Sequence, residues 1–213
     1  MSEEITELVF ANGTKITWER GLDGGGSTQY LDFLPYLNRI NRKYTSGLEW
    51  CSGLGAIGFS ILDAGICDRM SFMDFYPPAA PCTLANARDN GLTSKVVHYT
   101  IDQIQKIPLG VKFDLVVGNP PHCQNVPQHI QDVNPYAVRM LLDENWDIHR
   151  EFFNNIGKYL YKGADIIISE VYDNHDLIQL AKQAGLTYVA SVPAQELVKN
   201  SNPNSVIMHF QFN

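Results

Sequence analysis

The sequence lacks long apolar runs, closely spaced cysteines and an excess of basic residues. No stretch approaches the roughly 18 apolar residues that cross a bilayer. The acidic start, MSEEITELVF, has no apolar segment of the kind found in secretory signal peptides. These absences argue against a membrane-spanning or secreted protein, and we predict a cytoplasmic location with no membrane partner.

Disulfide and metal chemistry have little support in the sequence. The four cysteines are far apart and form no Cys-x-x-Cys pair: Cys51, Cys67, Cys82 and Cys123. In a reducing compartment, such cysteines are expected to be free thiols rather than disulfides or zinc ligands. The six histidines show no convincing ligand spacing either, so we predict no metal site.

Basic residues are also scarce. The 16 Lys and Arg against 23 Asp and Glu give a formal net charge of −7. Because affinity for a phosphate backbone comes mostly from Lys and Arg, this balance argues against a chain that grips nucleic acid unaided. It leaves room for a local basic patch.

What the 213 residues do contain is an alternation of apolar strands and amphipathic helices. Strands are predicted at 48–51, 69–75, 95–99, 113–118, 164–171, 186–192 and 205–212. Helices are predicted at 56–66, around 84–92, at 150–163 with Gly163 as its end, and at 176–185 with Asp173 or Asn174 as its cap. No helix separates the last two strands, so we expect them to be antiparallel.

This alternation predicts an α/β fold with a Rossmann-like, doubly wound, seven-stranded sheet. Six strands would be parallel and the last antiparallel, with ligand sites at the carboxyl ends of the strands. The predicted core covers residues 46–213. Residues 1–45 would form an extension made of a hairpin (8–18) and a helix (28–44) capped by Ser27 or Thr28.

A glycine-rich turn follows the first core strand. Gly53, Gly55 and Gly58 form G-x-G-x-x-G between a strand and a helix, where glycines allow a tight turn and a close approach of backbone to ligand. The same pattern also occurs for packing alone. Asp74 ends the next strand, roughly 20 residues after Gly53, where a carboxylate can accept hydrogen bonds from both hydroxyls of a ribose.

Two further acids bear on the choice of ligand. Asp102 follows the strand at 95–99 and is placed to accept from an adenine amino group, with Ile101 or Phe75 against the ring. It could equally cap the helical turn that follows. Up to this point NAD and S-adenosylmethionine fit alike. Glu49, four residues before Gly53, favours a cationic amino group over a pyrophosphate, and no second domain is apparent for a hydride-transfer substrate.

The strand FDLVVG (113–118) ends abruptly in Asn119-Pro120-Pro121-His122. Proline supplies no backbone donor and biases its neighbour away from helix. Asn-Pro is ordinary turn punctuation, but here it would face the glycine-rich turn across the sheet.

Together these motifs resemble the class I S-adenosylmethionine-dependent methyltransferases of the N-P-P-[aromatic] group. EWCSGLGAIG is similar to that family's glycine motif, Asp74 to its ribose-binding acid, Asp102 to its adenine-side acid, and NPPH to its catalytic tetrapeptide. Protein-glutamine methyltransferases acting on release factors share such a core and a helix resembling NARDNGL. Ribosomal RNA guanine-amino methyltransferases carry a loop resembling GLDGGGSTQYL (21–31).

The resemblance implies S-adenosylmethionine as the cofactor, held by Glu49, Gly53, Gly55, Asp74, Phe75 and Asp102. In the family, the Asn oxygen and the first proline's carbonyl accept the two hydrogens of a planar nitrogen and aim its lone pair at the methyl group. Asn119 and Pro120 take these places here, so their contribution would be orientation and electrostatics. His122 stands where the family has Tyr or Phe and would stack on the acceptor. Cys51 stands where the family usually has Gly.

The implied activity is methylation of an sp² nitrogen. A protein glutamine side chain is the favoured acceptor, because the acidic charge weakens the case for nucleic acid. RNA guanine or DNA adenine is the alternative acceptor, with a partner protein supplying basic surface. Two other readings stay open: a non-catalytic, cofactor-binding partner subunit and a nicotinamide-dependent oxidoreductase.

Overall fold

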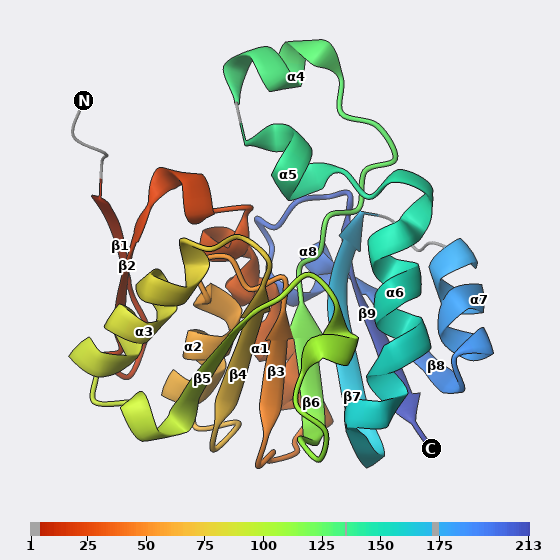
Figure 1. Ribbon diagram of the computed structural model, residues 1–213, viewed down its shortest axis with the longest axis horizontal. Helices are drawn as coiled ribbons and strands as arrows, with labels where there is room; N and C mark the ends of the chain where they lie inside the picture. The colour runs from red at the N-terminus through yellow and green to blue at the C-terminus, as the bar shows by residue number, and fades with distance from the viewer. Residues whose placement is uncertain (1–4, 135, 172–174) are drawn as a thin grey trace.

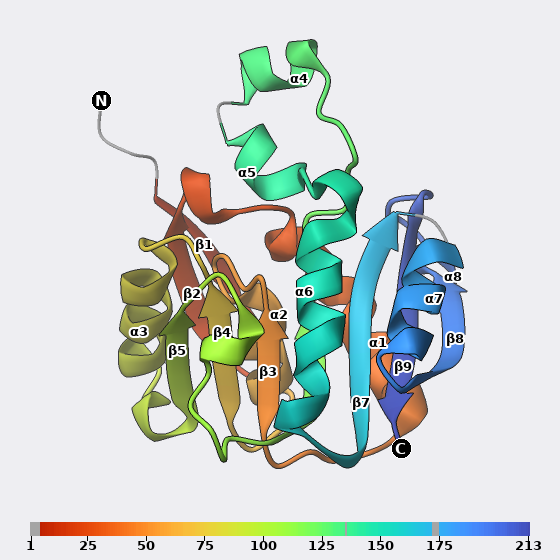
Figure 2. The same cartoon turned by 45° about the vertical axis from the view of Figure 1, so that its right-hand side comes forward.

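The computed structural model describes residues 5–134, 136–171 and 175–213, and shows a seven-stranded sheet with helices on both faces (Figure 1). The strand order is β5-β4-β3-β6-β7-β9-β8. The strands are β3 (Gly47–Trp50), β4 (Met70–Asp74), β5 (Val96–Thr100), β6 (Phe113–Gly118), β7 (Leu160–Val171), β8 (Leu186–Pro193) and β9 (Ser205–Phe212). Helices α1 (Gly26–Ile40) and α2 (Ala56–Asp63) lie behind the sheet, and α6 (Asp147–Ile156) and α7 (His175–Gln183) lie in front of it (Figure 2).

The predicted sheet topology is confirmed. β3 pairs in parallel with β4 and β6, β4 with β5, and β6 with β7. β9 runs antiparallel to both of its neighbours, β7 and β8. Six strands therefore share one direction and the last strand opposes them. Their carboxyl ends meet along one edge, the upper one in Figure 1.

Each face of the sheet is covered by a buried apolar cluster. Phe33 of α1 and Phe59 of α2 lie in one cluster, while Phe152 and Ile156 of α6 lie in the other with Leu177 of α7. All five side chains are fully buried. Burial of each large apolar side chain contributes roughly 1.5–3 kcal/mol to the free energy of folding. The two clusters therefore hold the helices against the sheet and keep the strand ends in register.

Helix α3 (Ala79–Asp89) packs against β5. The remaining elements are short: α4 (Gln128–Val133), α5 (Ala137–Leu141), α8 (Ala194–Leu197) and the 3₁₀ turns η1 (Arg20–Leu22), η2 (Thr93–Lys95), η3 (Ile104–Lys106), η4 (Glu144–Trp146) and η5 (Gly157–Tyr159). α4 and α5 stand above the carboxyl edge of the sheet (Figure 1).

The N-terminal hairpin forms as expected and is fastened to α3. β1 (Ile5–Val9) and β2 (Lys15–Glu19) pair antiparallel. The Asn86 side chain accepts from the Thr17 N–H at 2.9 Å and donates to the Thr17 carbonyl at 2.9 Å. The Asn90 side chain does the same for Lys15, at 2.8 and 2.6 Å. The two side-chain amides thus bond to the β2 backbone as a neighbouring strand would. This contact explains why asparagines occupy both positions of the NARDNG segment.

The start of α1 differs from the prediction. The helix begins at Gly26 with Gly25 as N-cap (φ 105°), and neither Ser27 nor Thr28 caps it. Asp23 takes that role, because its Oδ1 accepts from the Gly25 N–H at 2.9 Å and the Ser27 N–H at 3.2 Å. Ser27 donates its hydroxyl to the same carboxylate. The GLDGGGS loop is thus held in a defined turn.

The predicted helix at 150–163 was wrong at its end. α6 stops at Ile156, and β7 already begins at Leu160, which pairs with Phe113. Gly163, expected to end the helix, has φ 77° inside the strand. The predicted caps of α7, Asp173 and Asn174, lie outside the described residues. The one-turn helix α8 between the last two strands was not expected.

Candidate active site

A pocket lies at the carboxyl ends of β3, β4 and β6. In open α/β sheets, this is the edge at which ligands bind. Its sheet side includes Glu49, Gly53, Asp74 and Asn119, and the N-terminal segment and α5 cover it with Leu22, Gly24, Gly26, Arg139 and Met140. The pocket therefore brings together residues from seven separate stretches of the chain.

The glycine-rich turn is shaped by protein contacts. Gly53 and Gly55 have positive φ (48° and 82°). A Cβ on Gly53 would lie 2.7 Å from the Leu22 carbonyl oxygen, so the close approach that this glycine permits is to the N-terminal segment. Cys51 also has a positive φ (55°), a conformation that glycine adopts more easily. This fits the expectation that related proteins carry Gly at that place.

Glu49 lies in β3, and its buried carboxyl reaches the first turn of α2. Its Oε2 accepts from the Gly58 N–H at 2.7 Å, and a Cβ on Gly58 would lie 2.6 Å from the same oxygen. Burial raises the pKa of Glu49 to about 8, against the backbone donors of Gly58 and Ile57. A cation placed beside this carboxyl would stabilise its charged form, so the site suits a cationic amino group, as the sequence indicated.

Asp74, at the end of β4, accepts hydrogen bonds from the glycine-rich turn and from the loop that follows β4. Its Oδ2 accepts from the Gly53 N–H at 2.7 Å and its Oδ1 from the Tyr76 N–H at 2.9 Å. Burial raises its pKa, against these backbone donors. A carboxylate offers about four acceptor positions, so hydroxyls of a ribose can still bind. The contact with Gly53 was not foreseen.

The adenine-side candidates are more exposed. Phe75 is 50% exposed, and Asp102 lines the pocket while forming an ion pair with Lys106 at 2.5 Å. A side-chain hydrogen bond from Lys106 lowers the pKa of Asp102. The alternative role of Asp102 as a helix cap is not seen, because Gln103 precedes η3.

Asn119 carries the most informative polar atom in the pocket. Its Nδ2 donates to the Gly24 carbonyl at 3.2 Å, while its Oδ1 is buried and has no hydrogen-bond partner among the described residues. A buried, unpaired acceptor costs about 1–3 kcal/mol and in a native protein calls for an explanation. The Gly24 contact holds the amide in the orientation that leaves the oxygen available to a ligand.

The other three residues of the NPPH turn differ in whether they line the pocket. Pro121 lines the pocket, whereas Pro120 and His122 are not among its lining residues. His122 is partly buried, and its Nδ1 has no partner among the described residues. Burial lowers the pKa of His122, against the attraction of Glu170. A lowered pKa favours the neutral form of the ring, and the stacking of His122 on an acceptor stays a prediction.

Arg139 was missed as a site residue. Its guanidinium lies 3.7 Å from the centroid of the Tyr76 ring and donates to the Gly21 carbonyl at 2.6 Å. It therefore ties α5 to the loop after β4 and to the N-terminal segment, closing the pocket from above. Nothing in the local sequence indicated this contact.

A buried triad beside the NPPH turn was also missed. His149 contacts Asp143 through Nδ1 at 2.6 Å and Glu170 through Nε2 at 2.9 Å, and all three side chains are at most 1% exposed. The Asp143 N–H donates to the Cys123 carbonyl at 2.9 Å. The triad therefore connects the segment that follows NPPH to α6 and to the end of β7.

Other site types find no support among the residues that the structure describes. No group of three or more His, Cys, Asp or Glu side chains could hold a metal ion. The four cysteines are free. In the same described ranges, none of the helices has the length and apolar character needed to cross a membrane.

No family model matches the chain. Two curated relatives do. The ribosomal protein uL3 glutamine methyltransferase of Francisella tularensis is 22% identical over 163 residues, which is 75% of this chain and 51% of the relative. The release factor glutamine methyltransferase of Clostridium acetobutylicum is 28% identical over 144 residues, 65% of this chain and 50% of the relative. The chain thus matches about half the length of each.

Among solved structures, a 16S rRNA N2 G1207 methyltransferase of T. thermophilus, in complex with AdoMet and guanosine, superposes with a TM-score of 0.65. It is 12% identical, and the match covers 99% of this chain and 50% of that chain. These comparisons confirm the predicted fold and the resemblance to class I S-adenosylmethionine-dependent methyltransferases. Both curated relatives are named as methyltransferases, and the superposed rRNA methyltransferase structure contains AdoMet.

Proposed function

We propose that this chain transfers a methyl group from S-adenosylmethionine to a planar sp² nitrogen, with a protein glutamine side chain as the favoured acceptor. The observation that carries the proposal is the Oδ1 of Asn119, which has no hydrogen-bond partner among the described residues, while its Nδ2 donates to the Gly24 carbonyl. An acceptor oxygen in this position suits an N–H group of an incoming amide or exocyclic amine.

The cofactor-binding residues are proposed as the sequence suggested. Glu49 would meet the amino group, Asp74 the ribose hydroxyls, and Phe75 and Asp102 the adenine. Gly53 and Gly55 would form the turn beneath it. When bound there, the cofactor supplies an electrophilic methyl group.

The acceptor would be held rather than deprotonated before attack. Its nitrogen lone pair is delocalised, so a strong base is less useful than fixed geometry. Asn119 Oδ1 and the Pro120 carbonyl would accept its two hydrogens and direct the lone pair at the methyl group. His122 would pack against the acceptor, and burial lowers its pKa, which favours a neutral ring that adds no charge beside the cationic methyl donor.

Glutamine is favoured over a nucleobase because both curated relatives are named as glutamine methyltransferases. RNA guanine stays the alternative, since a structural neighbour is named as an rRNA N2 methyltransferase, and DNA adenine remains a further prediction. Three other statements also stay predictions: that residues 1–45 cover the core at 46–213, that a partner subunit takes part, and that the location is cytoplasmic.

The test is incorporation of labelled methyl groups into protein, RNA and DNA fractions. We expect label in protein, at a glutamine identified by mass spectrometry. Asn119→Ala should reduce it by about 100-fold while cofactor affinity persists. Asn125→Ala, an exposed asparagine in the same segment, is the control and should behave as wild type.

The other outcomes are equally distinct. Label in RNA or DNA would replace the acceptor and keep the reaction. Tight cofactor binding without label in any fraction would favour the non-catalytic subunit. Full activity in Asn119→Ala would remove the proposed role of this amide.

A further inference from the structure

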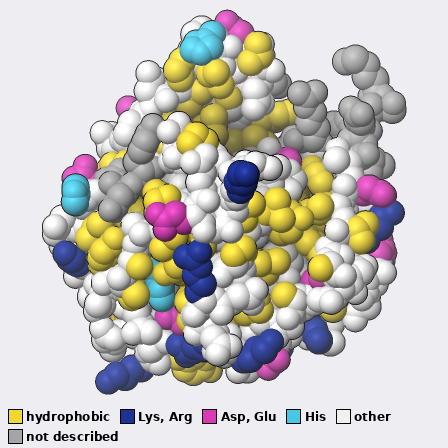
Figure 3. All heavy atoms as spheres, turned by 180° about the vertical axis from the view of Figure 1, so that it is seen from behind, with side chains coloured by type: hydrophobic (Ala, Val, Ile, Leu, Met, Phe, Trp, Pro, Cys, Tyr) yellow, Lys and Arg dark blue, Asp and Glu magenta, His cyan; other side chains and the backbone are white. Residues whose placement is uncertain are grey.

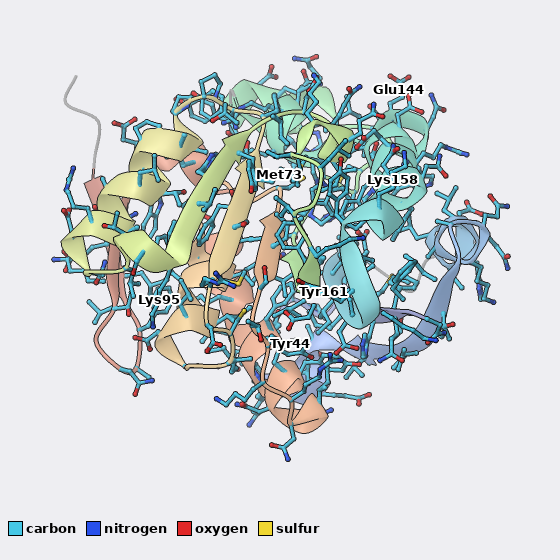
Figure 4. All side chains as sticks on the ribbon, turned by 60° about the horizontal axis from the view of Figure 1, so that its bottom comes forward. Tyr44, Met73, Lys95, Glu144, Lys158 and Tyr161 are labelled. Atoms are coloured by element: carbon cyan, nitrogen blue, oxygen red, sulfur yellow. The ribbon has the colours of Figure 1, made fainter. Side chains whose placement is uncertain are left out.

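A second hollow lies at the amino ends of the strands, at the opposite end of the sheet from the candidate active site. It is lined by Arg69, Lys95 and Lys112, together with hydroxyls of Thr45, Ser46, Ser71 and Ser94 and the ring of Tyr161. Figure 4, in which the lower side of Figure 1 comes forward, labels Lys95 and Tyr161 on this side of the sheet. The six residues of β6 separate the two ends by roughly 20 Å.

The three cations occupy equivalent places. Lys95, Arg69 and Lys112 directly precede β5, β4 and β6. In the sheet, β5 neighbours β4, and β3 stands between β4 and β6. Because neighbouring strands are about 4.8 Å apart, the cations form a row along the amino edge, and Ser46, just before β3, fills the place between them. We call these three residues the basic row.

Among the residues that the structure describes, the basic row is only partly balanced by acidic side chains. In the part of the chain that the structure describes, neither Arg69 nor Lys95 makes an ion pair, and both are exposed. The Lys112 ammonium donates to the Lys158 and Leu160 carbonyls at 2.7 and 3.4 Å, which are uncharged partners. The basic row therefore keeps its charge for a ligand.

The nearby acids are few. Asp114 lines the hollow and places one negative charge against the three cations, and its two oxygens accept from the Thr45 and Ser46 N–H groups at 2.8 and 2.9 Å. Asp68 is next to Arg69 in the sequence and is not among the lining residues. The whole chain has a net charge of −7, whereas the hollow is lined by more basic than acidic side chains. From behind, Lys and Arg side chains are also seen along the lower edge of the molecule (Figure 3).

Tyr161 favours a single-stranded nucleic acid over an acidic peptide as the ligand of this hollow. It is 53% exposed and lines the same hollow as the cations. A cationic track beside an exposed aromatic ring is the combination that binds single-stranded nucleic acids, because the cations hold phosphates while a base stacks on the ring. An acidic peptide would use the cations alone. The serine hydroxyls add donors for phosphate oxygens.

We propose that this hollow binds a single-stranded nucleic acid, with the basic row on successive phosphates and Tyr161 stacked on one base. The site goes beyond the proposed methyl transfer and does not depend on it. Because it lies at the far end of the sheet from Asn119, it anchors the protein on nucleic acid and does not present the methyl acceptor.

The test is fluorescence anisotropy with labelled uridine and thymidine oligonucleotides of about 12 nucleotides, a matched duplex, and a polyglutamate peptide. Both single strands should bind the wild type, and more tightly than the duplex or the peptide. For three phosphate contacts, the logarithm of the affinity should fall with the logarithm of salt with a slope of about −2.

The variants separate the two parts of the site. Lys95→Glu and Arg69→Glu should each weaken binding about tenfold or more and reduce the slope by about 0.7. Tyr161→Ala should weaken binding roughly tenfold and leave the slope unchanged. Lys199→Glu, an exposed residue outside the hollow with the same charge change, is the control and should bind as wild type.

Thermal unfolding and cofactor titration show whether each variant is folded, and Lys95→Gln provides a milder change if a reversal is not tolerated. No binding at low salt, an equal effect of Lys199→Glu, or equal affinity for polyglutamate would overturn the proposal. So would full affinity in Tyr161→Ala. Methyl transfer can fail without affecting any of these readouts, so the two proposals are tested separately.

Discussion

Replacing His149 by glutamine should destabilise the protein by about 3 kcal/mol below pH 6.5, and by much less above about pH 9. Both ring nitrogens contact carboxylates, Asp143 at 2.6 Å and Glu170 at 2.9 Å. A neutral imidazole has only one N–H, so two such hydrogen bonds require the charged ring. His149→Gln removes that charge and leaves two buried carboxylates facing each other.

The magnitude follows from the pKa. Burial opposes the charge on His149, but the attraction of Glu170 and hydrogen bonds to Asp143 and Glu170 outweigh it and raise the pKa from 6.5 to about 9. That rise corresponds to about 3 kcal/mol, at the lower end of the 3–5 kcal/mol typical of breaking a buried ion pair. Since the folded-state pKa is raised, this stability is complete below pH 6.5 and is lost as pH rises through about 9.

Urea denaturation of wild type and variant at both ends of this range measures the difference. Taking the difference between the two proteins cancels the titrating groups that do not interact with His149, including Glu49. His129→Gln, an exposed histidine in α4, is the control and should change stability by less than about 0.5 kcal/mol. A loss in His149→Gln that is the same at both pH values would refute the charged triad.

Two further predictions concern the pocket. Binding of S-adenosylmethionine near neutral pH should release a proton, because a cationic group lowers the pKa of Glu49 from about 8. Calorimetry in two buffers of different ionisation enthalpy detects the released proton. Equal binding heats in both buffers, or unchanged proton release in Glu49→Gln, would contradict this prediction. Gly53→Ala should weaken cofactor binding about tenfold, because its Cβ would lie 2.7 Å from the Leu22 carbonyl. Gly110→Ala, also at positive φ but in open space, shares the backbone strain without the clash and should keep wild-type affinity in the same titration.

Sequence reasoning succeeded where the signal was local. An apolar run followed by glycines or by Asn-Pro marks a strand and its end without knowledge of the fold, so the turn at Gly53 and the turn at Asn119 were both found. Asp74 was predicted to end a strand, and it is the last residue of β4. The parallel topology then placed these strand ends at one edge.

The misses share one physical reason, which is that they depend on contacts between distant segments. Leu160 extends the apolar face of α6 and looks helical in sequence, but pairing with Phe113 makes it the first residue of β7. Arg139 lies 118 positions from Gly21, whose carbonyl it contacts. The Asp143–His149–Glu170 triad joins a loop, a helix and a strand, and no spacing rule for single elements predicts it.

The most direct test of the central claim is calorimetric titration of S-adenosylmethionine and of NADH into wild type, Asp74→Ala and the exposed control Asp132→Ala. We predict binding of S-adenosylmethionine alone, retained in Asp132→Ala and lost or greatly weakened in Asp74→Ala. No binding of S-adenosylmethionine to the wild type, or binding that is indifferent to Asp74, would contradict the assignment of this pocket.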